Sequence, residues 1–327
     1  MRILITGGTG TISRAVVAVA CAAGHRVTVL NRGTREAVPV GVEHLVADAR
    51  DEAAWSAALG SRTFDAVVQF VAFTPDQVER DLRVLAGRTG QYVLISSASV
   101  YAKPVTDPVI TEDTPVGNPF SAYARDKIAC EAVLRGRDDV PWTIVRPSHT
   151  YGERGIPVNL HFGRPWAVVS RLLRGEPVLV QGDGESLWTF TWNEDFAVGL
   201  LGLLGNPGAR QRTVHITSDE SLTWNQAFAT LGETLGVTPR LAHVSTAMLV
   251  ALRPDLEASL SGDKSNTVIF DTSLIRTLVP GFTTPTRFSD GLDRSWAWLR
   301  QHPEAHEEDP AFDAFCDGVV ARIHAWA

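Results

Sequence analysis

The chain has 327 residues, a hydrophobic content of 44% and a formal net charge of −7 at pH 7. A chain of this length can bury one large core or two cores of intermediate size. Lys and Arg are scattered without a basic block, which argues against nucleic acid and anionic membranes as partners. The longest apolar run, residues 15–23, is too short to cross a bilayer.

The three cysteines, Cys21, Cys130 and Cys316, lie far apart and form no Cys-x-x-Cys pattern. They are typical of reduced structural thiols in a cytoplasmic protein, and no cluster of Cys and His predicts a metal site. A strand begins directly after Met1, so we expect no signal peptide and a cytoplasmic location.

The first stretch of the chain predicts a nucleotide-binding turn. The run Ile3-Leu4-Ile5 indicates a buried strand, and the glycines that follow it indicate a tight turn into a helix. We expect this helix to run from Thr11 to about Ala23, to end at Gly24, and to be followed by a second strand over Arg26–Leu30. Strand, turn, helix and strand form the opening unit of a dinucleotide-binding fold.

The turn has the chemistry that a pyrophosphate requires. At a helix N-terminus, free backbone N–H groups and the helix dipole favour negative charge, and glycines let the ligand approach closely. The spacing is Gly7-x-x-Gly10-x-x-Ser13, so a serine takes the place of a third glycine and we expect slightly looser packing there. The predicted cofactor contacts in this turn are Gly7, Gly8, Thr9, Gly10, Thr11 and Ile12.

The loop after the second strand bears on the choice between NAD and NADP. An acidic side chain there would bind the ribose 2′-hydroxyl, but this chain has Asn31 followed by Arg32 and, three residues on, Arg35, which slightly favours NADP. The alternative is that the two arginines are only solvated loop residues. The third strand, Glu43–Ala47, delivers Asp48, which could accept a hydrogen bond from the adenine amino group or cap a helix, a role that fits Asp51 better.

Two further strands extend the pattern. An apolar strand over residues 64–73 suits the centre of a parallel sheet, and its carboxyl end, with Ala72, should face the cofactor. A helix from Pro75 to about Gly87 leads to a strand over Tyr92–Ser97. The repeated order of strand, helix and strand predicts a doubly wound α/β fold with a parallel sheet.

Catalytic candidates follow the fifth strand. Ligands of open α/β sheets bind at the carboxyl ends of strands, so the Ser97 hydroxyl is well placed. Tyr123 and Lys127 share one face at the start of a helix. Tyrosine titrates at about pH 10 in water, and Lys127 and a positive nicotinamide ring could stabilise its phenolate. The alternatives are an interfacial aromatic for Tyr123 and a turn cap for Ser97, with Ser96 and Ser99 as other candidates.

The motifs that carry a family resemblance are Thr6-Gly7-Gly8-Thr9-Gly10, Asp48, Ser96-Ser97-x-x-Val100-Tyr101, Tyr123-x-x-x-Lys127 and Arg146-Pro147-Ser148-x-x-Tyr151-Gly152. With them the chain resembles an extended short-chain dehydrogenase/reductase of the NAD-dependent epimerase/dehydratase type, closely over the first 155 residues and more loosely beyond. The resemblance implies that Ser97, Tyr123 and Lys127 form the catalytic triad. It also implies that Ser97 contacts substrate, and that Tyr123, Lys127, Pro147 and Ser148 contact the cofactor.

Two departures from the family pattern bear on the reaction. The family's frequent Arg-Asp-Phe is Ser186-Leu187-Trp188 here, at a substrate or diphosphate contact. The 4,6-dehydratases of the family carry an Asp-Glu pair directly after the catalytic serine, where this chain has Ala98 and Ser99. We therefore expect no ordinary 4,6-dehydration, although His149 or Glu153 could supply an acid or a base from the other side of the cleft.

The composition changes after about residue 155. We expect residues 1–155 to form an NAD(P)-binding Rossmann domain and residues 156–327 to form a smaller, mixed α/β substrate lobe, with segments near 190–217 returning to the first domain. Apolar residues at helical spacing predict a docking helix over residues 309–327. The predicted substrate contacts are His149 and Asn159, and the further polar candidates, each with a solvated surface position as its alternative, are Arg171, Arg253 and Lys264.

Together these features predict an NAD(P)-dependent epimerase or dehydratase that acts on a sugar or nucleoside by transient oxidation of a secondary hydroxyl. An NADPH-dependent carbonyl reductase is the second hypothesis. A third is a non-catalytic RNA-associated scaffold, against which both the net charge of −7 and the complete Ser97, Tyr123 and Lys127 set count. The expected partner is a small-molecule substrate, with a homodimer as a further possibility.

Overall fold

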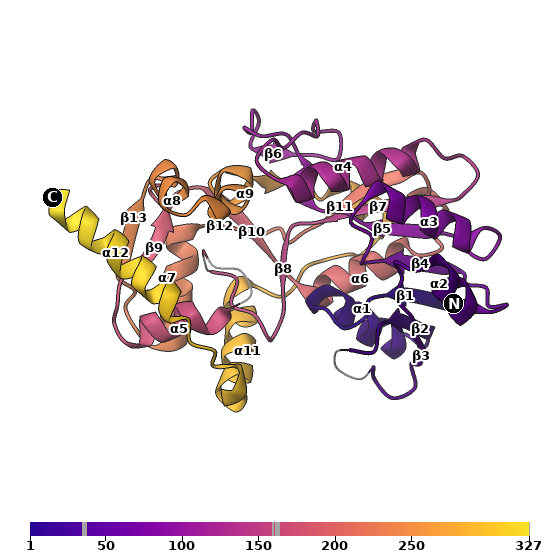
Figure 1. Cartoon of the computed structure of the whole chain (residues 1–327), viewed down its shortest axis with the longest axis horizontal. Coiled ribbons are helices and arrows are strands. Elements are labelled where there is room, and N and C mark those ends of the chain that lie inside the picture. Colours follow the sequence, from indigo (N-terminus) through magenta and orange to yellow (C-terminus); the bar gives the residue numbers. More distant parts are fainter. Residues whose placement is uncertain (35–37, 159, 161–163, 327) are drawn as a thin grey trace.

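A computed structural model describes residues 1–34, 38–158, 160 and 164–326. The chain forms two lobes with the termini at opposite ends (Figure 1). The larger lobe is built on a seven-stranded parallel sheet in the order β11-β7-β5-β4-β1-β2-β3. Its strands are β1 (Arg2–Thr6), β2 (Arg26–Asn31), β3 (Glu43–Val46), β4 (Ala66–Gln69), β5 (Tyr92–Ile95), β7 (Trp142–Pro147) and β11 (Arg212–Ile216).

Helices cover both faces of this sheet, as the doubly wound pattern predicts. Ile3 and Ile5 pack on one face and Leu4 on the other, because successive side chains of a strand point to opposite sides. The first face is covered by α1 (Thr11–Ala22), α6 (Asn193–Leu203) and α10 (Ser273–Leu278), and the second by α2 (Glu52–Leu59), α3 (Pro75–Leu85) and α4 (Ala122–Arg135). The predicted fold class is confirmed.

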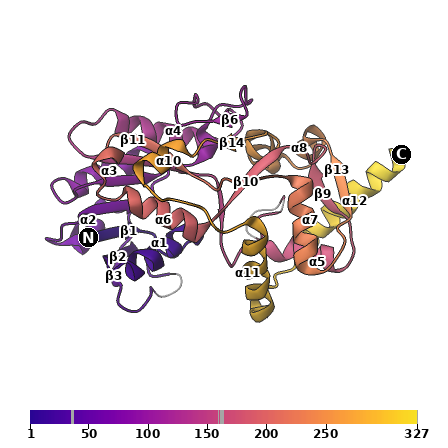
Figure 2. The same cartoon turned by 180° about the vertical axis from the view of Figure 1, so that it is seen from behind.

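Three elements of the larger lobe, β11, α6 and α10, come from late in the chain. β11 pairs with β7 at the edge of the large sheet, with Val214 opposite Val145. Helix α6 lies beside α1, and α10 lies beside both α6 and β11 (Figure 2). The division of the chain at residue 155 stays a prediction, with these returning segments as the observation that bears on it.

The second lobe consists of small sheets and helices. Its core holds Trp188, Phe190, Trp224 and Phe288. The strand sets are β12 (Ser221–Thr223), β10 (Leu187–Trp192) and β8 (His149–Tyr151); β13 (Leu241–Val244) and β9 (Val178–Gln181); and β14 (Ile269–Phe270) and β6 (Val109–Ile110). The helices are α5 (Pro165–Leu173), α7 (Trp224–Leu235), α8 (Thr246–Leu252), α9 (Glu257–Ser259), α11 (Phe288–Gln301) and α12 (Pro310–Trp326).

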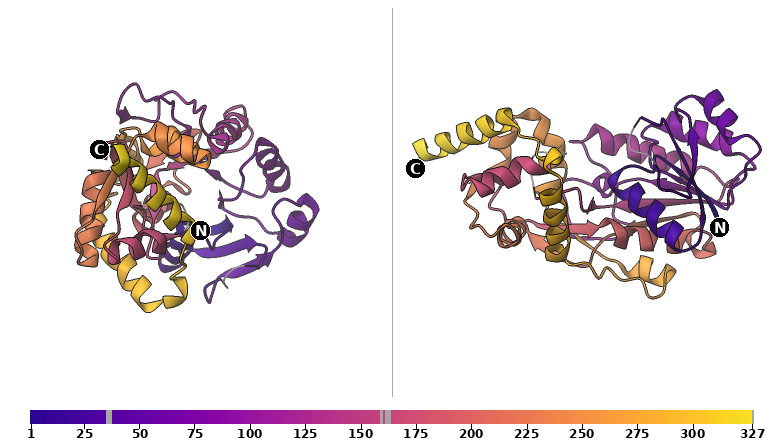
Figure 3. Two further views of the ribbon diagram at one scale, coloured as in Figure 1. Left: turned by 60° about the vertical axis from the view of Figure 1, so that its left-hand side comes forward. Right: turned by 90° about the horizontal axis from the view of Figure 1, so that it is seen from below.

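Helix α12 docks on the second lobe through its first half and extends from the end of the molecule (Figure 3). Phe312, Cys316 and Val319 are buried in a cluster with residues of β9 and α8. The docking helix expected from the apolar spacing is therefore present. Within the described part of the chain, no helix is both long and apolar enough to cross a membrane.

The strand predicted over residues 64–73 is shorter in the structure, where β4 spans only Ala66–Gln69. The chain leaves the sheet at Gln69 because the side-chain oxygen of this residue accepts the backbone N–H of Val71 at 2.8 Å, which closes a turn. Before the strand, Phe64 forms only an isolated bridge to Thr89. The apolar run in the sequence extends beyond both ends of the strand, so it does not show where pairing with the neighbouring strands ends.

The packing of the turn after β1 can be tested by comparing Gly8, which lies in this turn, with Gly24, which follows α1; both adopt left-handed backbone. Gly8 (φ +75°) has no room for a Cβ, which would lie 2.6 Å from Cγ1 of the buried Val29, whereas Gly24 (φ +77°) has open space around it. We expect Gly24→Ala to lower the free energy of unfolding by about 1 kcal/mol from backbone strain, and Gly8→Ala by about 2–4 kcal/mol from strain plus overpacking. Urea titration measures both, and equal losses would show that the turn has room to spare.

Candidate functional site

A cleft of about 500 Å³ lies at the carboxyl edge of the large sheet, between the two lobes. Its walls come from the segment after β5, the start of α4, the β7 to β8 connection, and the segment from Pro254 to Lys264 that forms the short turns η3 (Pro254–Leu256) and η4 (Leu260–Lys264) with α9. This is where ligands of open α/β sheets bind. The predicted site residues that line it are Ile12, Ser97, Tyr123, Pro147, Ser148 and His149.

Ser97 follows β5 and faces the cleft. Its hydroxyl lies 2.8 Å from the Ser99 hydroxyl and accepts the backbone N–H of Ser99 at 3.2 Å, so it caps the short turn η1 (Ala98–Val100) as well. The neighbouring Ser96 points away and donates to Glu131 at 2.6 Å in the protein interior. Of the three serines, Ser97 and Ser99 therefore line the cleft and Ser96 does not.

Tyr123 stands in the first turn of α4, and 44% of its surface is exposed. Partial burial raises the pKa of its phenol, while interaction with the Ser97 hydroxyl works in the opposite direction. The two side chains therefore meet in the cleft. The phenol remains protonated at neutral pH unless a further positive charge lowers its pKa.

Lys127 lies one helical turn after Tyr123 and is buried. Its Nζ donates to the backbone carbonyls of Ala72 at 2.7 Å and Ile95 at 2.9 Å, and lies 5.8 Å from the centre of the Tyr123 ring. Burial lowers the pKa of this ammonium to about 8. The predicted cofactor contact Ala72 thus holds the lysine through its carbonyl, and the lysine brings positive charge toward the phenol.

A buried ion pair anchors the same helix to the sheet. Glu131, two turns after Tyr123, receives two hydrogen bonds from Arg146, at 2.9 Å from Nε and 2.6 Å from Nη2. Burial alone would lower the pKa of Arg146, but the bonds to Glu131 hold it above its ordinary value. Because Ser96 also donates to Glu131, one carboxylate joins α4, β5 and β7 directly below the cleft.

The glycine turn fits a dinucleotide phosphate. Gly7 (φ +102°) and Gly8 adopt backbone that favours glycine, and a Cβ on Gly7 would come within 3.2 Å of Val71. The turn ends at the N-terminus of α1, whose first turn holds no acidic side chain to repel an anion. Ser13 is buried, and its hydroxyl accepts the backbone N–H of Gly10 at 3.0 Å, so the serine is accommodated in the place of a third glycine.

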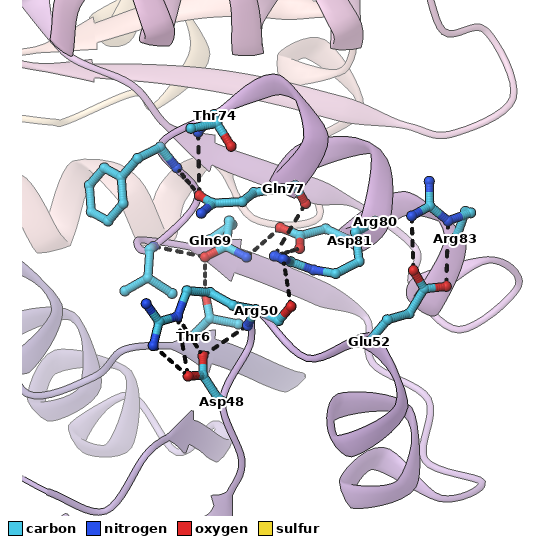
Figure 4. Close-up of polar contacts among 12 residues, drawn as sticks. Thr6, Asp48, Arg50, Glu52, Gln69, Thr74, Gln77, Arg80, Asp81 and Arg83 are labelled. Carbon is cyan, nitrogen blue, oxygen red and sulfur yellow. Dashed lines mark hydrogen bonds and ion pairs between the residues drawn. The ribbon is translucent and has the colours of Figure 1, made fainter.

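A second buried network lies beneath this turn (Figure 4). Thr6, the last residue of β1, donates to the side-chain oxygen of Gln69 at the end of β4. Gln69 in turn donates to Asp81 of α3 at 2.5 Å, and Arg80 and Tyr92 also donate to Asp81. Burial raises the pKa of Asp81 to about 6. The network fixes the carboxyl ends of the two central strands, and nothing in the sequence pattern singled it out.

The residues predicted near the adenosine have different surroundings. The Asn31 side chain is engaged within the protein, where it donates to the Gly7 carbonyl at 2.9 Å and accepts the Gly33 N–H at 2.8 Å. Arg32 is exposed, and Arg35 lies outside the described residues. Asp48 forms an ion pair with Arg50 at 2.7 Å, and these hydrogen bonds lower its pKa to about 2. Asp51 caps α2 by accepting the N–H of Ala54, as expected.

His149 lies in the cleft wall but is uncharged. It accepts a hydrogen bond from Nε1 of Trp188 at 3.1 Å, and burial lowers its pKa to about 3. A protonated imidazole is therefore not available at neutral pH. The other predicted substrate contact, Asn159, lies outside the described residues.

Two of the further polar candidates do not line the cleft. Arg171 is buried beneath α12, with ion pairs to Asp313 at 2.9 Å and to Asp317 at 2.7 Å, so its role is to dock that helix. Arg253 pairs with Asp255 at 3.3 Å. Both candidates therefore have carboxylate partners within the protein, and neither is among the described residues that line the cleft. Lys264 is buried, with Nζ 5.7 Å from the Trp224 ring centre.

The structure adds cleft residues that the sequence did not indicate. They are Lys103 in the loop after η1 and, on the Pro254–Lys264 segment, Asp255, Ser259 and Asp263. No motif surrounds them, and about 150 residues of chain separate Lys103 from this segment. Within the described residues, no group of three or more Cys, His, Asp or Glu side chains could hold a metal ion.

The fold and the site together define a nicotinamide-dependent enzyme of the Rossmann class. The family model for the NAD-dependent epimerase/dehydratase family matches residues 3–216, and the chain belongs to this family. The resemblance seen in the motifs is confirmed. The chain is therefore an NAD(P)-dependent enzyme, and the hypothesis of a non-catalytic RNA-associated scaffold is set aside.

Relatives in this family include a reductase and an epimerase. The chain is 27% identical over 290 residues to the 2′-dehydrokanamycin reductase of Streptomyces kanamyceticus, covering 86% of this chain and 80% of the relative. It is 30% identical over 154 residues to a UDP-glucose 4-epimerase of Corynebacterium glutamicum, covering 41% and 46%. The structure of MoeE5 in complex with UDP-glucose and NAD has a TM-score of 0.70 at 22% identity, covering 93% and 100%, which shows the shared fold.

The buried ion pair offers a test of what holds α4 in place. Glu131→Gln leaves Arg146 charged and without its partner in the protein interior, and we expect a loss of about 3–5 kcal/mol in the free energy of unfolding. Asp139→Asn, which breaks the exposed ion pair with Arg137, should leave unfolding unchanged and serves as the control. Urea titrations compare the two variants, and similar curves for both would contradict a bracing role for Glu131.

Proposed function

We propose that this enzyme interconverts a secondary hydroxyl and a ketone on a sugar, with Tyr123 as the residue that transfers the proton. One observation carries the proposal: Ser97, Tyr123 and Lys127 come together at one end of a cleft that also contains Ile12 of the glycine turn. A hydroxyl, a phenol and a buried ammonium in this arrangement suit acid and base catalysis at a carbonyl oxygen.

Each residue has a distinct role in the proposed reaction. When bound, the nicotinamide dinucleotide supplies or accepts the hydride. Ser97 donates a hydrogen bond to the substrate oxygen and orients it. In the reductive direction Tyr123 gives its proton to that oxygen as the new C–H bond forms, and the phenolate takes a proton from solvent before the next turnover. In the oxidative direction the phenolate takes the hydroxyl proton, and in both directions the charge of Lys127 stabilises the phenolate.

We propose reduction of a sugar ketone as the net reaction. A relative that matches 86% of this chain is a reductase named for 2′-dehydrokanamycin, which supports that choice over the epimerase or dehydratase expected first. Epimerisation, which forms the ketone and returns the hydride to its other face, is the second candidate, and the UDP-glucose 4-epimerase relative supports it.

Elimination of water is not part of the proposal. It would require a second acid or base beside the ketone, and Ala98 and Ser99 supply none. His149 is held neutral by burial, and Glu153 is exposed and is not among the described residues that line the cleft. Hydride transfer with the dinucleotide and proton transfer by Tyr123 then account for the whole reaction.

Tyr123→Phe tests the proton-transfer assignment. We expect loss of nearly all turnover of 2′-dehydrokanamycin with NADPH, and NADP affinity within about threefold of wild type, because the phenol acts on the substrate oxygen and does not hold the dinucleotide. The variant keeps the ring beside Phe73, so the fold should be unaffected. Steady-state kinetics and a dinucleotide titration give the two readouts. Retention of most of the wild-type kcat would refute the role of Tyr123.

The choice of NADP over NAD is tested at Arg32. We propose that this exposed arginine binds the 2′-phosphate, so Arg32→Ala should weaken NADP binding about tenfold or more and change NAD binding little. The control is Arg210→Ala, at an exposed residue preceding β11 on the opposite edge of the sheet. Dinucleotide titrations of the three proteins decide the matter, and an equal effect on both cofactors would make Arg32 a solvated loop residue.

A further inference from the structure

The charges in the cleft indicate what kind of sugar it accepts. Among the described residues that line it, the charged side chains are Lys103, Asp255 and Asp263, and none is an arginine. Asp255 at the rim is paired with Arg253. Lys103 and Asp263 lie deeper, and their protonation and hydrogen bonding decide which ligand group would be favoured there.

The charges of Lys103 and Asp263 influence each other, and Lys264 also acts on Asp263, but in the described part of the chain these groups make no close contact with one another. Neither the ammonium nor the carboxylate makes a hydrogen bond there, and no described group of opposite charge lies within 4.0 Å of either. Burial lowers the pKa of Lys103 and raises the pKa of Asp263 to about 6. The positive charges of Lys103 and Lys264 keep the pKa of Asp263 from rising further. Asp263 is therefore ionised at neutral pH and without hydrogen-bond donors.

A carboxylate without donors selects its ligand by charge. An ionised carboxylate only accepts hydrogen bonds, so Asp263 needs a ligand group that donates. A nucleoside diphosphate carries acceptor oxygens and negative charge, which Asp255 and Asp263 would repel. Among the described residues that line the cleft, Lys103 is the single cation that could offset this repulsion. An ammonium group donates and also neutralises the carboxylate, in a charge-assisted bond that is stronger than one from a hydroxyl.

The remaining walls suit the body of a sugar without a nucleotide. Trp188, Tyr101 and Phe270 offer apolar ring surface, and Ser148 and Thr150 offer hydroxyl groups. The Ser259 hydroxyl, buried at the same wall as Asp263, has no hydrogen-bond partner in the described part of the chain. Polar groups left unpaired beside apolar rings match a ligand that has several hydroxyls on a compact ring.

We propose that the cleft binds an unphosphorylated amino sugar and that Asp263 is the carboxylate that recognises one of its ammonium groups. This inference rests on the proposed function, since it names the substrate class of the same site. Asp263 is a specificity residue in it, and takes no part in proton transfer to the ketone. Lys103 then donates to a hydroxyl or ring oxygen of the same sugar.

Calorimetric titration of the NADP-loaded enzyme tests the proposal with three probes: kanamycin, fully N-acetylated kanamycin and UDP-glucose. We expect kanamycin to bind at least tenfold more tightly than either of the others, because acetylation removes the positive charges and the nucleotide adds negative ones. Asp263→Asn should weaken kanamycin at least tenfold while changing NADP affinity less than twofold. Asp139→Asn, remote from the cleft, is the matched control and should bind as wild type does.

Four results would overturn the inference: no measurable binding of kanamycin, tighter binding of UDP-glucose, equal binding of kanamycin and its acetylated form, or unchanged kanamycin affinity in Asp263→Asn. None of these bears on proton transfer by Tyr123. If Tyr123→Phe abolishes turnover of a ketosugar while Asp263→Asn leaves kanamycin binding intact, the proposed function stands and the amino-sugar assignment fails. Retained turnover in Tyr123→Phe would reject the proposed function itself.

Discussion

The buried contact between Glu131 and Arg146 is the constraint on which the geometry of the site depends. Neither side chain reaches solvent, so each charge depends on partners within the protein: Glu131 also accepts hydrogen bonds from Ser96 and Arg135, and Arg146 lies over the Tyr101 ring. The cost of removing both charges from water makes any displacement of α4 from β5 and β7 expensive. Tyr123, Lys127 and Glu131 follow one another at intervals of four residues, so the anchor that fixes Glu131 also fixes the phenol and the ammonium above it.

The Gln69 network serves the neighbouring strands in a similar way. Thr6 and Gln69 end β1 and β4 side by side, and both are tied to Asp81 on the helix behind them. The glycine turn begins directly after Thr6, so its position follows from this network. Each carboxylate has an arginine partner, Arg146 for Glu131 and Arg80 for Asp81, but burial still raises the pKa of Asp81 to about 6.

The sequence predicted what local patterns determine. The strands of the large sheet up to β5, the glycine turn and the shared face of Tyr123 and Lys127 depend on short-range patterns, and the structure has each of them. Local patterns did not reveal what distant segments decide: Arg171, a candidate for substrate contact or a solvated surface position, is buried against Asp313 and Asp317, more than 140 residues away. Lys103 and Asp263 were not predicted as site residues for the same reason, because only the fold brings them to one cleft. The roles proposed for the site residues remain predictions.

The division of labour between the lobes explains why the motifs end where they do. Under the proposed function, the larger lobe holds the groups that act on the ketone, and these must keep the same geometry whatever the rest of the substrate looks like. The second lobe, together with the loop that carries Lys103, supplies groups that meet the remainder of the substrate, and there only charge and shape matter. Under the proposed function, a change of substrate requires new residues such as Asp263 on the Pro254–Lys264 segment, while Ser97, Tyr123 and Lys127 stay as they are. A motif can therefore indicate the reaction, but the substrate has to be inferred from the charged side chains in the cleft that make no hydrogen bond within the described protein.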